Sequence, residues 1–290
     1  MIIRTLPLLF GLLTFAGCTG DTKDDSGEGA DTDTDTDTDT DTDTDTDTDT
    51  DTDTDTVSYT VTGTALDFAT MLPATSGLCL VAVDPGPAIT GGEPTVLGMT
   101  KVGAKGAFSV GPLLEKPALG LVLIVQDCAE EGTVYATGTG IKAPVVAALE
   151  PGATLADQHA FSIDVTTESG MVSSFSAAGA SWDPTTEGVL LGFVLDGSTG
   201  GPVNGATVTG AASTTYYLDA NSSDGMFTTM SGDAISVNSS TNAKVGSVFA
   251  IPAAPITTYS ASADGYTFES LTGGSLPGIA LFVAFFGTAG

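Results

Sequence analysis

The stretch GFVLDGSTGGPVNGATV, from Gly192 to Val208, decides the fold expected for the second half of the chain. Its apolar opening is typical of a β-strand that ends at Asp196. The TGG sequence at 199–201 can turn the backbone through positive φ, and Pro202 stiffens the exit of that turn. The GA pair at 205–206 then allows a close approach of another backbone. The stretch therefore predicts a strand, a tight turn and a second strand.

Two further segments follow in a set order. SDGMF at 223–227 is typical of a hairpin between two strands, and YSASADGY at 259–266 is a strand that ends in a Gly-Tyr pair. With the opening stretch, this ordered set resembles the carboxypeptidase regulatory-like domain, a seven-stranded transthyretin-like sandwich. The resemblance implies a β-sandwich domain over residues 188–290, with a longer loop at 238–255 than the family usually has.

A weaker copy of this pattern occupies residues 57–149. YTVTGTA at 59–65 predicts the opening strand, and GAFSV at 106–110 stands where the second half has its GMF sequence at 225–227. The run from Leu119 to Val125 predicts a fully buried strand. We therefore expect a related sandwich in the first half.

Residues 150–187 are expected to connect the two sandwiches. TTE at 166–168 precedes apolar residues at helical spacing up to Ala178, which predicts a short capped helix. The last apolar run, Ile279–Phe286, has only eight residues, so it predicts a buried terminal strand and not a membrane span. The expected fold class is all-β, with two transthyretin-like or Ig-like antiparallel β-sandwich domains in tandem.

The N-terminus carries the pattern of a signal peptide over residues 1–17. Arg4 precedes a mostly apolar run at 6–16, which is too short to span a bilayer, and FAGC at 15–18 places small residues before Cys18. This ending resembles the lipobox of bacterial lipoproteins, although Phe15 stands where leucine is usual. The resemblance implies that Cys18 becomes the acylated N-terminus, and Thr19 after it implies sorting to the outer membrane. An ordinary secretory peptide with a chance cysteine is the alternative.

Residues 18–56 predict a disordered acidic linker. This segment contains seventeen acidic residues and one lysine, with an unbroken Asp-Thr repeat at 31–56 and almost no apolar side chains. It cannot bury enough surface to offset the entropy of ordering. The repeat could also bind calcium, but the glycine and glutamate that an EF-hand loop requires do not occur within it. A loose counterion atmosphere is the plainer interpretation.

The remaining 234 residues, 57–290, form an acidic head with nineteen acidic and five basic residues, a net charge near −14. Such a surface repels nucleic acid and anionic lipid headgroups, so neither is expected as a partner. Its two cysteines, Cys79 and Cys128, both lie on strand-like runs. Their parity favours a disulfide in an oxidising envelope. Two buried free thiols are the alternative.

Catalytic chemistry has little support in the sequence. The chain has one histidine, His159, so a zinc site would need an unusual carboxylate set. GASWD at 179–183 begins like a nucleophile elbow but lacks its closing glycine, and no phosphate-binding glycine motif occurs. We expect no catalytic residues, no metal and no cofactor.

Two hypotheses for function follow. The first is a non-enzymatic cell-envelope lipoprotein, lipid-anchored in the outer membrane, with a head that is periplasmic or exposed at the cell surface. Its role would be structural, adhesive or binding of a protein or carbohydrate ligand. Trp182, Tyr216 and Tyr217 are candidates for an aromatic contact patch, although core packing is expected for at least two of them. The second hypothesis is a secreted hydrolase that uses carboxylates and His159.

Overall fold

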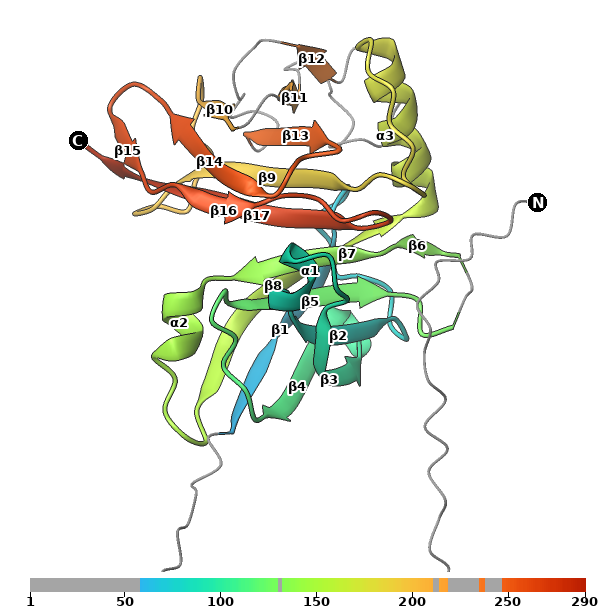
Figure 1. The fold of residues 1–290 in the computed structure, drawn as a ribbon, viewed down its shortest axis with the longest axis vertical. Helices are drawn as coiled ribbons and strands as arrows, with labels where there is room; N and C mark the ends of the chain where they lie inside the picture. The colour runs from blue at the N-terminus through green and yellow to red at the C-terminus, as the bar shows by residue number, and fades with distance from the viewer. Residues whose placement is uncertain (1–57, 130–131, 211–213, 219–234, 238–246) are drawn as a thin grey trace, which may run out of the picture. The chain divides into compact units, whose positions relative to one another are not determined.

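The predicted all-β class is confirmed by the computed structural model (Figure 1). Its described residues are 58–129, 132–210, 214–218, 235–237 and 247–290. The predicted signal peptide, the acidic linker and the hairpin turn at 223–227 lie outside them.

Strands make up about half of the described residues. They are β1 (Tyr59–Asp67), β2 (Cys79–Asp84), β3 (Thr95–Lys101), β4 (Ala107–Leu113), β5 (Leu121–Gln126), β6 (Val134–Tyr135), β7 (Thr137–Ile141), β8 (Thr154–Asp164), β9 (Val189–Asp196), β10 (Thr207–Thr209), β11 (Tyr216–Leu218), β12 (Ile235–Val237), β13 (Val248–Pro252), β14 (Thr257–Ser262), β15 (Tyr266–Phe268), β16 (Leu271–Gly273) and β17 (Ala280–Ala289). The helices are α1 (Gly86–Ile89), η1 (Ala104–Gly106, a 3-10 turn), α2 (Ala143–Ala147) and α3 (Val165–Ala177).

The described strands form one large sheet and two small ones. The large sheet has the order β12-β11-β13-β9-β17-β7-β5-β2-β3, and β15 also pairs with β17. The small sheets are β4-β1-β8-β6 and β10-β14-β16. The last strand, β17, thus lies between β9 and β7, and strands of both halves of the chain share one sheet (Figure 1). Strands on both sides of the predicted domain boundaries at 149 and 188 contribute to that sheet. The boundaries themselves stay predictions.

Three pairings are parallel, which differs from the purely antiparallel arrangement expected. β1 pairs in parallel with β8, and β17 pairs in parallel with both β7 and β9. In β17, Phe282 lies opposite Leu191 of β9 and Thr139 of β7. The apolar run at 279–286 and β9 are hydrophobic without alternation, which is typical of central strands covered on both faces.

The core crosses the predicted boundaries. Phe68, Phe161, Phe193 and Phe282 are all buried and form a single aromatic cluster. The ring centroids of Phe68 and Phe282 are 4.6 Å apart, and those of Phe161 and Phe282 are 4.7 Å apart. Phe68 comes from the first segment, Phe161 from the connector and the other two from the last segment. All three segments therefore contribute to this cluster, whereas two further clusters draw nearly all their residues from one half of the chain each.

Helix α3 confirms the predicted helix but has a different cap. The side chain of Asp164, just before the helix, accepts a hydrogen bond from the Thr167 backbone N–H at 2.6 Å. The helix is thirteen residues long, and TTE at 166–168 lies inside its first turn. Met171 and Phe175 are fully buried and join the aromatic core. Among the described residues, no helix combines the length and the apolar character needed to cross a bilayer.

Candidate functional site

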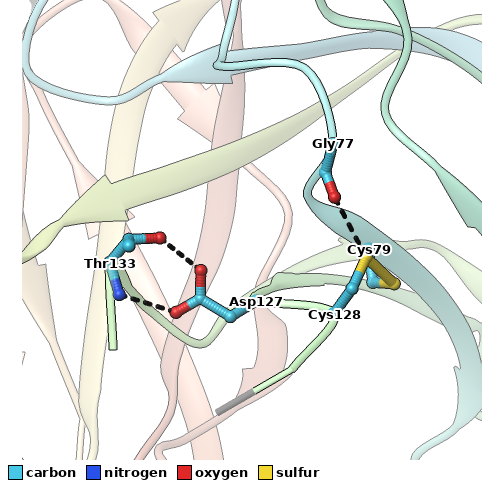
Figure 2. Close-up of a disulfide and its surroundings, with 5 residues drawn as sticks. All are labelled: Gly77, Cys79, Asp127, Cys128 and Thr133. Carbon is cyan, nitrogen blue, oxygen red and sulfur yellow. Dashed lines mark hydrogen bonds between the residues drawn. A yellow bond between two sulfur atoms is a disulfide. The ribbon is translucent and has the colours of Figure 1, made fainter. Parts of the chain in front are cut away.

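The two head cysteines form the predicted disulfide (Figure 2). Cys79 is the first residue of β2, and Cys128 lies two residues beyond the end of β5. Because β2 and β5 pair from Cys79–Gln126 to Val83–Val122, the ladder brings the two Cα atoms to 4.9 Å. The Gly77 carbonyl oxygen lies 3.0 Å from the Cys128 Sγ. A bonded sulfur carries no hydrogen, so this approach is a close contact and not a hydrogen bond.

Asp127 closes the loop beside the disulfide (Figure 2). Its carboxylate accepts hydrogen bonds from the Thr133 backbone N–H at 2.7 Å and from the Val134 backbone N–H at 3.2 Å. The Thr133 hydroxyl also donates to it. The carboxylate thereby ties the residue after β5 to the start of β6. The two sulfurs are bonded to each other, and the Asp127 carboxylate accepts hydrogen bonds from neighbouring residues. This corner therefore has a structural role.

The Asp196 turn is the second polar cluster, and it lies within the GFVLDGSTGGPVNGATV stretch at 192–208. One carboxylate oxygen of Asp196 accepts from the Ser198 hydroxyl at 2.5 Å, the Ser198 N–H at 2.8 Å and the Thr199 N–H at 2.9 Å. The other accepts from the Tyr266 hydroxyl at 3.0 Å. Gly200 has a φ of +69°, the positive value that the TGG sequence predicts. The motif therefore builds a turn and ties it to β15.

These hydrogen bonds change the titration of both partners. The hydrogen bond from the Ser198 hydroxyl, with those from the Thr199 and Ser198 backbone N–H groups, holds the pKa of the Asp196 carboxyl well below its usual range. The same carboxylate raises the pKa of the Tyr266 hydroxyl by accepting its proton in a hydrogen bond. A carboxylate held ionised by its own turn is a weak general base, because it gives up this stabilisation on protonation.

In the Asp196→Asn variant, the free energy of unfolding is expected to fall less at acid pH than it does in the wild type. Because the folded pKa of Asp196 is lowered, the ionised turn stabilises the fold fully above about pH 4, and this contribution is lost as pH falls through the folded pKa. The wild-type urea midpoint should therefore drop more between about pH 6 and about pH 2 than the Asp196→Asn midpoint. Tyr266→Phe is the control, since it removes one hydrogen bond and keeps the charge, so the difference should shrink only in part. Equal pH dependence in wild type and Asp196→Asn would contradict the role assigned to this turn.

The aromatic contact patch considered from the sequence is wrong. Trp182, Tyr216 and Tyr217 are all buried. The Trp182 Nε1–H donates to the Gly188 carbonyl at 3.1 Å, and the Val208 N–H donates to the Tyr217 hydroxyl oxygen at 2.7 Å. The alternative, core packing, is the one that the structure supports. Helix α3 covers Tyr216 through Phe175, whose ring centroid is 5.3 Å away.

His159 lies on β8 with an exposed side chain, opposite Thr64 of β1. No group of three or more His, Cys, Asp or Glu side chains that could hold a metal occurs among the residues that the structure describes. Cys18, the predicted lipid-attachment residue, lies outside those residues. Sequence reasoning missed the role of Asp127, for which the Asp-Cys pair and the threonine six residues later are the only local signal.

No protein-family model and no curated protein matches the chain. Among solved structures, the Bacillus anthracis TIE protein is 15% identical, with 80% of this chain and 34% of that chain covered and a TM-score of 0.23. The shaft pilin SpaA from Lactobacillus rhamnosus GG is 10% identical over 80% of this chain and 98% of its own, with a TM-score of 0.24. The minor pilin of Streptococcus agalactiae is 11% identical over 80% and 96%, with a TM-score of 0.21. At such TM-scores these similarities carry no argument about function.

Proposed function

We propose that the chain is a bacterial cell-envelope lipoprotein, anchored in the outer membrane through acyl chains, palmitate among them, on Cys18. Residues 19–56 are a disordered acidic stalk, and the β head is displayed in the periplasm or at the cell surface. The observation that carries the proposal is the position of Cys18, directly after a short apolar segment with an early arginine and directly before a strongly acidic run. Two or three acyl chains hold a protein firmly on a membrane, whereas one chain is marginal.

The head has a structural, adhesive or ligand-binding role without catalysis. Its described polar clusters, around Asp127 and Asp196, serve to close turns. No described residue set favours the alternative hydrolase, because His159 is exposed and no metal-binding group of three side chains surrounds it. The partner is a protein or a carbohydrate. A glycan array and a hydrolase substrate panel separate the two hypotheses, since turnover that His159→Ala abolishes would support the hydrolase instead.

Intact-mass spectrometry of the protein from its native host tests the anchor. We expect a chain that begins at Cys18 and carries the added mass of two or three acyl groups. The variant Cys18→Ala should retain its first seventeen residues and carry no acyl mass. A mature N-terminus at another residue, or a Cys18 thiol without acyl mass, would rule out the lipoprotein.

A further inference from the structure

Two segments of the head expose apolar side chains next to one another. One is the loop 114–120 between β4 and β5, and the other is 143–149, which contains α2 and the residues after it. Leu114 and Leu119 are 57% and 55% exposed, and Val145 is 42% exposed. We call this surface the apolar end. Its exposed apolar side chains are Leu114, Ala118, Leu119, Val145, Ala147 and Ala148.

A side chain that binds backbone carbonyls and a close approach of two backbones hold the two segments of the apolar end together. The Lys116 ammonium group donates to the Ala147 carbonyl at 3.4 Å and also to the Leu149 carbonyl. At the other end of the loop, Gly120 packs so closely that a Cβ there would collide with the Ile141 carbonyl oxygen. The loop and the segment 143–149 therefore lie side by side.

The chain enters the head at this same end. The Ser58 carbonyl accepts from the Gly152 N–H at 2.6 Å, directly after the second segment. The Tyr59 hydroxyl donates to the Glu115 carbonyl at 2.9 Å, within the first segment. Because Ser58 follows the acidic linker, the apolar end is the part of the head that is tied to the anchored end of the chain. At the far end of β1, the turn that follows the strand carries another exposed leucine, Leu72, which is 63% exposed.

The apolar end has no net charge, although the head as a whole is strongly acidic. The segment 143–149 contains no ionisable side chain, and in the loop 114–120 the charges of Glu115 and Lys116 cancel. Just outside, Lys142 lies 3.4 Å from the Glu269 carboxylate. A surface of this kind does not need anionic headgroups to bind, and exposed apolar patches commonly mark surfaces that bind a partner or a membrane.

We propose that the apolar end docks on the surface of the lipid bilayer that anchors the chain, with Leu114, Leu119 and Val145 at the boundary between headgroups and acyl chains. This inference rests on the proposed lipid anchor for its biological setting. The bound surface is a zwitterionic lipid interface, because the contact is apolar and uncharged. Affinity for such an interface scales with the apolar area that becomes buried.

Hydrogen exchange on vesicle-bound protein tests the docking separately from native acylation. Cys79 and Cys128 are bonded, so Cys18 is the one cysteine left to couple in the chain that begins there. That chain is coupled through Cys18 to maleimide lipid in phosphatidylcholine vesicles and compared with the uncoupled chain in solution. Amides of 113–120 and 142–149 should exchange about tenfold more slowly on vesicles, whereas amides of the 67–72 turn should be unchanged.

Leu119→Asp and Leu72→Asp are the matched variants, since each puts one charge on a comparably exposed leucine at opposite ends of β1. Leu119→Asp should restore most of the solution exchange rate on vesicles, and Leu72→Asp should keep the slowing. Equal rates on vesicles and in solution would overturn the inference. So would slowing that grows with protein density at constant lipid, because a second copy would then be covering the apolar end. Failure of the native acylation test affects the lipoprotein proposal alone.

Discussion

Phe282→Ala is expected to destabilise the whole head by about 3–5 kcal/mol, the usual cost of removing a buried phenylalanine. Phe282 is fully buried in β17, and its ring packs against Phe68, Phe161 and Phe193. These partners come from all three predicted segments, so the cavity would weaken the cluster through which the segments contact one another. Urea unfolding should show a single transition at a lower midpoint, with coincident curves from the fluorescence of the only tryptophan, Trp182, and from circular dichroism.

Phe286→Ala is the matched control for that variant. Phe286 lies on the same strand and, four residues on, faces the same side of the sheet as Phe282, but it is about half exposed. Its replacement should change the free energy of unfolding by no more than about 1 kcal/mol. Two separate unfolding transitions in the wild type, or similar losses in the two variants, would show that the segments fold independently of β17.

Local features of this fold are readable from the sequence because neighbouring residues determine them. The Asp196 turn follows from the TGG sequence at 199–201, in which Gly200 adopts a positive φ. Strands β1 and β17 lie where YTVTGTA at 59–65 and the apolar run at 279–286 predict them. β5 begins at Leu121, two residues later than predicted, because Leu119 is exposed in the preceding loop. The disulfide follows from the parity of two cysteines on strand-like runs.

Long-range pairing was not readable in the same way. The position of β17 beside β7 depends on Gly138, where a Cβ would lie 2.6 Å from the Leu281 side chain. A glycine in a TGTGI strand carries no local sign of which residue will lie over it. Likewise, Trp182 and Tyr216 are buried because Phe175 of α3 packs on both rings. The sequence favours core packing for at least two of the three aromatic residues, but which helix covers them depends on how the helix and the sheet pack, and an isolated sequence window does not contain that information.

Removal of the disulfide is expected to lower the free energy of unfolding by about 4 kcal/mol in the chain-entropy account. Cys79 and Cys128 are 49 residues apart, so the bond closes a long loop in the unfolded chain. In the folded state, β2 and β5 already pair along their length, so the ladder should persist without the bond. The loss should therefore arise mainly from a more open unfolded state, with a slightly larger denaturant m-value. Urea unfolding with and without reductant measures both quantities.

The double variant Cys79→Ser/Cys128→Ser separates this effect from other actions of the reductant, because its unfolding should be the same with or without it. Asp127 offers a second comparison, since its carboxylate holds the same corner through Thr133 and Val134 within the folded state. Asp127→Ala should lower stability without raising the m-value, because it leaves the covalent loop closed. If reduction instead abolished the circular dichroism of the strands in the absence of urea, the disulfide would be holding the folded sheet together. The β2–β5 ladder would then be too weak to position the corner by itself.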